Sequence, residues 1–276
     1  MNRVKPHTDF KGTIESGLFK MMTIGLGKYK GAIQYHRANI RHGYETVITS
    51  VGRAMLANAR IGFGVGLVEN GYDETARIEA FNAENLEAGE RRLLKDAREW
   101  MARLPFSPID VLIVEEMGKN VSGAGMDTNV IGRPSNPHEP FPADPKILWI
   151  VALDLTEGSY GNAVGIGNAD FTTRRLVEKI DMKPTLINAI TACAPGGAKI
   201  PPAYETDREA IETALSCIGL TPPEKARVVR IRNTLLLGEI EVSEAFLAEL
   251  AGRPELTRLG DPEPLAFDAA GRLLPF

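Results

Sequence analysis

The spacing of apolar residues predicts two amphipathic helices and two strands in the first part of the chain. In residues 44–59, apolar side chains recur at helical spacing and stop where a glycine-rich stretch begins. Residues 61–69 alternate glycine with large apolar residues, which predicts a buried strand whose glycine face is approached closely by another backbone. A second strand is expected at 76–81. The clearest helix covers residues 82–104, where one stripe contains Leu86, Leu93, Leu94, Ala97, Trp100, Met101 and Leu104.

After Pro105 and Pro108, predicted strands alternate with predicted helices. The strands are expected at 109–114, 147–155 and 226–231, with a further strand or buried segment at 185–192. The helices are expected at 172–180, 207–218 and 243–250, the last of them capped by Ser243. Residues 133–145 contain five prolines and predict a long ordered loop or a lid.

This alternation is typical of an α/β architecture. We therefore predict two α/β domains, residues 1–105 and residues 106–276, and we expect a mostly parallel sheet flanked by helices in the second.

Composition and charge narrow the class of protein. The chain is 43% hydrophobic and 25% charged, as in an ordinary globular protein. No apolar run approaches the roughly 20 residues that span a bilayer, and the opening residues lack the pattern of a secretory signal. A net charge of -4 leaves no surplus of cations for a phosphate backbone, which argues against nucleic acid. Cys193 and Cys217 match neither a zinc pattern nor a disulfide framework, which favours the cytoplasm.

Chemically active residue types are concentrated between His7 and His36. His7 follows Pro6 and precedes Asp9, which suits an exposed loop and acid/base chemistry; the alternative is a surface histidine hydrogen-bonded to Asp9. Lys20 follows an apolar run, where desolvation makes an amine nucleophilic; the alternative is a lysine that reaches along apolar surface into water. His36 is a candidate ligand of nickel or zinc, or a partly buried histidine bonded to backbone.

The glycines of GLGKYKG, residues 25–31, nearly match the G-x-G-x-x-G spacing of dinucleotide-binding loops. No hydrophobic strand precedes them, so that match is weak. A loop that binds phosphate through backbone amides and Lys28 or Lys30 stays open as an alternative.

Two loops of the second half also hold polar candidates. Lys119 and Asn120 follow the strand at 109–114, where α/β proteins place ligand contacts, so they are candidates for binding a substrate carboxylate. They equally suit a role in shaping the loop. The same two interpretations apply to the loop that holds Asn162, Asn168 and Asp170.

One set of residues resembles the nickel-pincer-nucleotide site of the lactate racemase family. The set is Pro6-His7, a glycine turn at Gly12, Ser16-Gly17 followed by Lys20, and His36 sixteen residues beyond Lys20. The resemblance implies that Lys20 carries the cofactor through a thioamide, that His36 ligates nickel, and that His7 is a catalytic acid/base. With the glycine loop, it makes Lys20, Gly25, Gly27 and Lys28 the candidate cofactor contacts.

The resemblance implies a cofactor-dependent isomerase, a racemase or epimerase of a 2-hydroxyacid such as lactate. The cofactor accepts a hydride while a histidine removes the hydroxyl proton. Residues 1–105 would then be the C-terminal part of the cofactor-binding catalytic domain. Because the family's second catalytic histidine and its substrate-binding arginine lie upstream, we expect an N-terminal half from elsewhere, and cofactor-making enzymes as further partners.

Two other functions remain open from the sequence. One is a nucleotide-binding oxidoreductase that uses GLGKYKG as its phosphate loop. The other is a truncated homologue that keeps the fold without catalysis.

Overall fold

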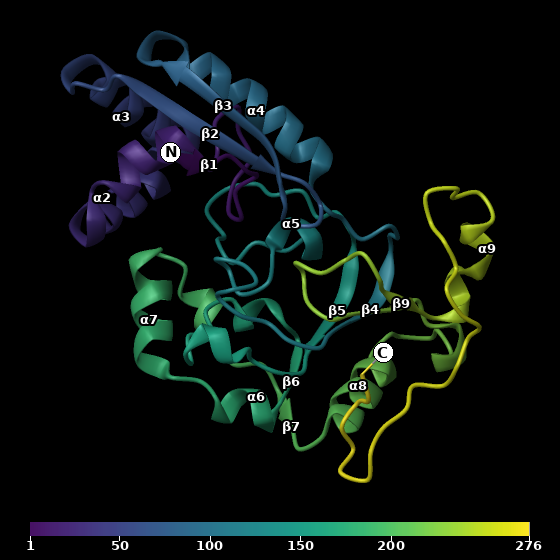
Figure 1. Cartoon of the computed structure of the whole chain (residues 1–276). Coiled ribbons are helices and arrows are strands. Elements are labelled where there is room, and N and C mark those ends of the chain that lie inside the picture. The colour runs from purple at the N-terminus through teal and green to yellow at the C-terminus, as the bar shows by residue number, and fades with distance from the viewer. Residues whose placement is uncertain (276) are drawn as a thin grey trace.

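Two separate β-sheets organise the protein, and helices pack on each of them (Figure 1). The computed structural model describes residues 1–275. The first sheet has three strands and the second has six, five of them parallel. The predicted α/β class, with a mostly parallel sheet in the second half, is therefore confirmed.

The first sheet has the order β1-β2-β3. Strand β1 (Asn2–Arg3) pairs parallel to β2 (Phe63–Glu69), which pairs antiparallel to β3 (Thr75–Asn82). The helices of this part are α1 (Leu18–Lys20), the π-helix η1 (Met21–Gly25), α2 (Lys28–His42), α3 (Tyr44–Asn58), the 3-10 helix η2 (Ala83–Asn85) and α4 (Leu86–Trp100).

The glycines of β2 make room for side chains of neighbouring helices. A Cβ on Gly64 would lie 2.8 Å from Leu86, and one on Gly66 would lie 2.5 Å from Leu93. The expectation that another backbone approaches this face is therefore wrong, because leucine side chains of α4 fill the space instead. The stripe predicted at 82–104 supplies these leucines, although the helix itself ends at Trp100.

The second sheet has the order β7-β6-β5-β4-β8-β9. Its strands are β4 (Ile109–Val114), β5 (Ile147–Ala152), β6 (Phe171–Thr173), β7 (Ala203–Tyr204), β8 (Val228–Ile231) and β9 (Glu241–Val242), and only β9 runs antiparallel to its neighbour. Its helices are α5 (Thr128–Ile131), η3 (Glu157–Ser159), η4 (Ile166–Asn168), α6 (Arg174–Glu178), α7 (Met182–Thr191), η5 (Pro195–Ala198), α8 (Asp207–Ser216), η6 (Pro223–Lys225), η7 (Glu244–Phe246) and α9 (Leu247–Leu250).

The two sheets keep separate hydrophobic cores. One core runs from Val4 to Ala97, and the residues of the other two, on the two faces of the second sheet, begin at Leu104. Division into domains after residue 105 stays a prediction, and the chain passes from the first core to the second between Ala97 and Leu104. Within residues 1–275, no helix has both the length and the apolarity to cross a bilayer.

Several local predictions are wrong. Residues 185–192 belong to helix α7, which begins where the Asp181 side chain accepts a hydrogen bond from Lys183 N. The helix expected at 172–180 starts as strand β6 and becomes helical only at Arg174. Ser243 does not cap its helix, because its hydroxyl donates to Ala226 O and accepts from Val228 N. The glycine-lysine stretch at 25–31 is not one open loop, because Gly25 ends the π-helix η1, Leu26 and Gly27 form a turn, and α2 begins at Lys28.

The glycine face of β2 gives a stability prediction. We expect Gly66→Ala to lower the free energy of unfolding by about 1 to 3 kcal/mol, because its new methyl group overpacks the core against Leu93. Gly62→Ala is the matched control, since a Cβ there meets nothing within 4 Å. Chemical denaturation of both variants measures the effect, and equal stability of the two would contradict this packing.

Candidate functional site

The loop that carries His7 is fixed by a buried carboxylate. Backbone hydrogen bonds between Lys5 and Ser16 close the loop at its base. Inside it, the Glu15 side chain accepts hydrogen bonds from His7 N at 2.6 Å, Gly12 N at 3.0 Å and the Arg98 guanidinium at 2.5 Å. A buried carboxylate is tolerated only with such partners. Glu15 therefore fixes the backbone from which the His7 ring projects.

Steric contact with a neighbouring side chain explains the glycine of the Ser-Gly-x-x-Lys motif. Gly17 immediately precedes α1, and a Cβ on it would lie 2.4 Å from the Glu90 carboxylate. Glu90 projects from α4, is fully buried, and accepts a hydrogen bond from Phe19 N at 2.9 Å. Burial raises the pKa of Glu90 to about 7. Gly17 is thus needed for space, and Glu90 orients the short helix that ends in Lys20.

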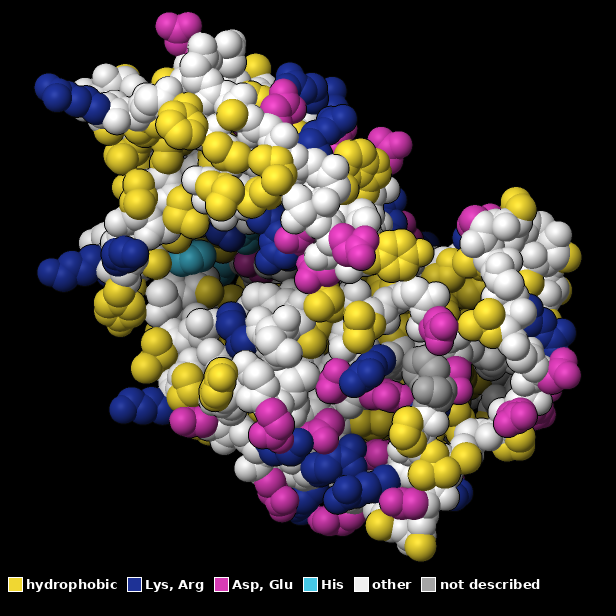
Figure 2. All heavy atoms as spheres, in the orientation of Figure 1, with side chains coloured by type: hydrophobic (Ala, Val, Ile, Leu, Met, Phe, Trp, Pro, Cys, Tyr) yellow, Lys and Arg dark blue, Asp and Glu magenta, His cyan; other side chains and the backbone are white. Residues whose placement is uncertain are grey.

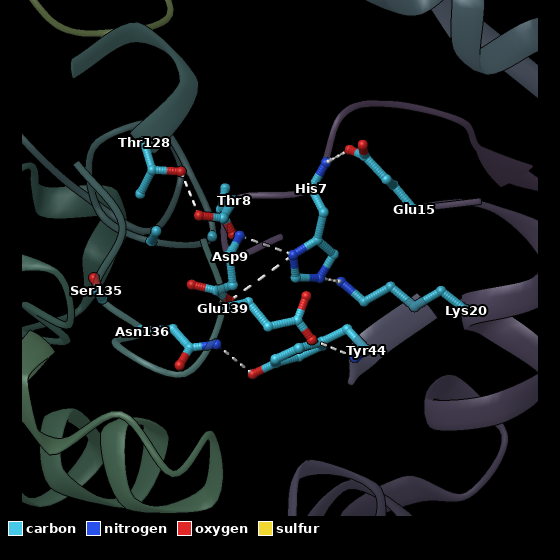
Figure 3. Close-up of polar contacts among 12 residues, drawn as sticks. His7, Thr8, Asp9, Glu15, Lys20, Tyr44, Thr128, Ser135, Asn136 and Glu139 are labelled. Atoms are coloured by element: carbon cyan, nitrogen blue, oxygen red, sulfur yellow. Dashed lines mark hydrogen bonds and ion pairs between the residues drawn. The ribbon is translucent and has the colours of Figure 1, made fainter. Parts of the chain in front are cut away.

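Lys20 and His7 meet at hydrogen-bond distance. The Lys20 Nζ atom lies 2.7 Å from His7 Nε2, while His7 Nδ1 accepts a hydrogen bond from Asp9 N at 3.0 Å (Figure 3). Since Nδ1 accepts, the neutral ring carries its proton on Nε2 and donates it to Lys20. Only an uncharged amine has the lone pair to accept that bond.

The electrostatics of the pair agree with this assignment. Burial, followed by the charges of Lys20 and Lys11, lowers the pKa of His7 well below its usual value. Burial lowers the pKa of Lys20 to about 8, although Asp9 opposes the shift. The setting predicted for Lys20 was apolar, whereas its amine lies against the polar ring of His7 and near Asp9, and burial lowers its pKa. The exposed loop predicted for His7 is wrong, because only 5% of the residue is exposed.

His36 faces the same space from helix α2. Its ring centroid lies 6.1 Å from that of Tyr44, and the Tyr44 ring lies 5.9 Å from that of His7. The Nδ1 atom of His36 is buried and has no hydrogen-bond partner. Burial and the nearby charge of Lys20 lower its pKa, which favours the neutral ring. A neutral imidazole with an unused nitrogen is suited to bind a metal or a donor group.

Asn39 lies one turn after His36 and was missed by the sequence analysis. It is 1% exposed, and neither polar atom of its amide has a hydrogen-bond partner. Its side chain lies near the Tyr44 hydroxyl, which accepts a hydrogen bond from Asn136 at 3.0 Å. The i, i+3 spacing from His36 would have pointed to Asn39 had the helix been predicted.

The second half of the chain closes the site from the other side. Thr128 donates a hydrogen bond to Thr8 O, and Glu139 accepts one from Tyr44 N (Figure 3). The proline-rich segment expected at 133–145 is irregular and supplies both Asn136 and Glu139.

Lys119 is the predicted substrate contact that reaches this space. Burial lowers its pKa, and its charge acts on Asp9, whose own pKa is raised by burial. Its amine also donates to Gly123 O at 2.6 Å and Asn188 Oδ1 at 3.1 Å. Lys119 therefore adds positive charge near Asp9 and Lys20.

Asn120 and the polar residues of the loop at 156–170 make hydrogen bonds that stabilise the fold. Asn120 Oδ1 accepts from the Thr156 hydroxyl. Asn162 accepts from Val164 N, and Asn168 donates to Ser135. Asp170 accepts from Arg133 and from Ile150 N. These contacts favour the loop-shaping interpretation, although a role of Asn120 in substrate binding stays untested.

The candidate phosphate contacts lie at the turn between the π-helix η1 and α2, where Lys28 has a positive φ of 51°. Gly25 ends the π-helix, and Gly27 O accepts a hydrogen bond from Gly31 N at 2.8 Å. Lys28 and Lys30 project into solvent at the start of α2. This geometry lacks the open loop that the phosphate hypothesis required. Cofactor contacts at Gly25, Gly27 and Lys28 remain predictions.

Two further features concern metal ions and cavities. Within residues 1–275, no three or more His, Cys, Asp or Glu side chains are grouped so as to hold a metal ion. A cavity of about 740 Å³ lies elsewhere, beyond β4 and β5, and charged residues on its wall, such as Arg175 with Asp154 and Asp207, pair with one another.

Comparison with known proteins finds no matching family model, no significantly similar curated protein and no significantly similar solved structure. The function proposed below therefore depends on the residues and on their geometry.

The lowered pKa of Lys20 predicts its reactivity. Acylation or reductive methylation of Lys20 should reach half of its maximal rate near pH 8, because the amine is uncharged above that pH. Peptide-level mass spectrometry of protein made without cofactor-producing enzymes measures this, with exposed Lys28 as the internal control. If the two lysines share one pH profile, the buried neutral amine is refuted.

Glu90 predicts a pH-dependent stability. In the folded protein the pKa of the Glu90 carboxyl is about 7, above the ordinary value of 4.5 for a glutamate side chain. The protonated carboxyl therefore stabilises the fold below pH 4.5, and this contribution is lost as the pH rises through 7. Glu90→Gln should remove up to ~3 kcal/mol of the stability difference between pH 4.5 and pH 8. Denaturation at both values measures it, with Glu99→Gln, on the exposed side of the same helix, as the control. An unchanged difference in Glu90→Gln would contradict the burial argument.

Proposed function

We propose that this chain is the catalytic part of a nickel-pincer-nucleotide-dependent racemase or epimerase, an isomerase of the lactate racemase type that acts on a 2-hydroxyacid such as lactate. The observation that carries the proposal is that the Lys20 amine contacts the His7 ring while the half-buried His36 ring is near enough for the charge of Lys20 to lower its pKa. The pKa of Lys20 is lowered to about 8, and His36 Nδ1 has no hydrogen-bond partner within residues 1–275.

The residues present suit the implied cofactor. Covalent attachment needs an uncharged amine, which the contact with His7 and the burial of Lys20 both favour. Nickel binds imidazole nitrogen well, and the buried Nδ1 of His36 is such a donor. When bound, this cofactor supplies the hydride acceptor that inversion of a hydroxyl-bearing carbon requires.

His7 is suited to move the substrate's hydroxyl proton. Its ring is neutral near physiological pH, but the bond from Asp9 N places the ring proton on Nε2, so Nε2 would accept the substrate's proton only after the ring proton moves to Nδ1 and that bond is released. Asp9 Oδ2 lies 3.9 Å from His7 Nδ1, close enough to stabilise the ring once it gains a proton. Attachment of the cofactor to Lys20 would leave Nε2 of His7 available for substrate.

Lys119 is the residue proposed to attract the substrate's carboxylate. It lies in the loop after the central strand β4, where ligands of parallel sheets bind. The charges of Lys119 and Asp9 act on each other, so the two side chains lie near one another in the site. Asn120 is the second proposed contact and would have to release Thr156 to bind substrate.

The wider setting is part of the proposal. We propose that the chain works in the cytoplasm, where Cys193 and Cys217 would stay as the free thiols seen here. Its partners would be the cofactor-making enzymes and a polypeptide that supplies the second acid/base. A nucleotide-binding oxidoreductase is less favoured, because residues 25–31 form a helix end, a short turn and the start of α2 instead of a glycine loop that follows a strand. Titration with NAD and NADP tests that alternative.

The decisive experiment is a search for the cofactor on Lys20. After co-expression with cofactor-making enzymes, intact mass and peptide mapping should find an adduct on Lys20 and nickel in the protein. Lys20→Ala should lose both, whereas His36→Ala should keep the adduct and lose nickel, because attachment and metal binding use different side chains. Lys95→Ala, at an exposed lysine of α4 that is not among the predicted cofactor contacts, is the control. An unmodified Lys20 in nickel-free protein would refute the assignment, and an adduct without turnover of any 2-hydroxyacid would favour a non-catalytic homologue.

A further inference from the structure

The first sheet has one covered face and one uncovered face. Helices α1 and α4 cover the side on which Gly64 and Gly66 lie. On the opposite side, β2 and β3 present a row of apolar residues, Phe63, Val65, Leu67, Ala76, Ile78 and Ala80. Phe63 is 71% exposed and Ile78 is 65% exposed. Figure 2 shows hydrophobic side chains gathered over the region of these strands.

Strand β3 is also an unprotected edge. It is the last strand of its sheet and runs for 8 residues from Thr75 to Asn82. Every second pair of its backbone N–H and C=O groups faces away from β2, and no further strand pairs with that side within residues 1–275. A long exposed edge with apolar residues is a template for pairing with another strand.

The sequence of β3 is complementary to itself. Ala76, Arg77, Ile78, Glu79 and Ala80 form a charge-complementary palindrome centred on Ile78. In an antiparallel pair with a twofold axis at Ile78, each Arg77 lies opposite a Glu79, and Ala76 lies opposite Ala80. Moving the axis to Arg77 or to Glu79 would place like charges opposite each other. The charges therefore select one register and one partner, an identical strand.

The helices leave room for this pairing. Arg77 and Glu79 lie on the helix side, where they bond Asp96 and Arg92 of α4. Leu86 and Leu93 of α4 pack over the glycines of β2, and α4 meets β3 at Gly89, which packs against Phe81. With strands ~4.8 Å apart, the two β2 strands would lie ~14 Å apart across the new pair, whereas packed helices need only 8–10 Å. The two copies of α4 would thus clear each other, with the Arg77 and Glu79 side chains between them.

We propose that two copies of this chain associate through β3, forming one continuous six-stranded sheet about a twofold axis at Ile78. The interface is symmetric, with two Arg77–Glu79 pairs between the copies and Ile78 against Ile78 at the centre.

Charge reversal tests the proposal on the full chain by light scattering after gel filtration and by sedimentation velocity. Wild type should form a dimer as its concentration rises. Arg77→Glu and Glu79→Arg should each raise the dimer dissociation constant by about tenfold or more, because each places like charges opposite each other twice. Two variants should restore association: the double change R77E/E79R, and an equimolar mixture of the two single variants. Weakening by each single reversal together with rescue by the double change is specific to the antiparallel register centred on Ile78, whereas rescue by the mixture shows that the two β3 strands face each other.

Further variants distinguish the loss of pairing at the β3 edge from other causes of dimer dissociation. Circular dichroism shows whether the single variants remain folded, since each also loses an ion pair with α4. Ile78→Lys keeps both of those pairs, and it should abolish the dimer by placing two ammonium groups on the axis. Phe63→Lys, on the exposed face but at the far end of β2, should leave the dimer intact. A monomer at all concentrations, dimers that survive both single reversals, or dissociation by Phe63→Lys alone would overturn the proposal.

Discussion

The carboxylate of Glu15 is the interaction on which the candidate site depends. It is buried and held by two backbone N–H groups and by Arg98. Each donor alone contributes little to net stability, but an unpaired buried carboxylate would cost several kcal/mol. The loop consequently has one low-energy conformation, and it is the one that presents His7 to Lys20. Arg98 comes from α4, so the same contact also ties the loop to the core of the first sheet.

Burial gives the contact between His7 and Lys20 its chemical character. In water, a lysine amine is charged at neutral pH and would repel a second cation. Here the loss of solvent disfavours the charged forms of both side chains, and the hydrogen bond between them needs an uncharged amine. A second buried carboxylate, Glu90, helps to orient the helix that carries Lys20. The fold thus uses two buried acids to position one reactive amine.

The site lies where the two sheets meet, and each contributes different chemistry. The first supplies the reactive nitrogen atoms of His7, Lys20 and His36. The second supplies Lys119 and the irregular segment whose Asn136 and Glu139 bond Tyr44. Contacts such as Thr128 with Thr8 link the parts by hydrogen bonds instead of a shared apolar core. Interfaces of this polar kind allow relative movement of the parts they join.

The sequence by itself determined the elements whose signals are local. Periodicity located the helices at 44–58 and 86–100 and the central strands β4 and β5, because apolar spacing reflects which side of an element meets the core. It also singled out Lys20 and His36 as candidates. Periodicity was insufficient for 185–191, where an apolar run suggested a strand, although Leu186, Ile187 and Ile190 are exposed on a helix.

Only the tertiary structure decided how the candidate residues act. The partners that matter are far apart in sequence: Glu90 lies 71 residues from Phe19, and Arg98 lies 83 from Glu15. No local pattern encodes such distances. For the same reason the sequence could not show that His7 is buried, that Gly17 makes room for a carboxylate, or that Asn39 has no partner. Burial and charge belong to the packed chain, and they determine which of the nitrogen atoms are reactive.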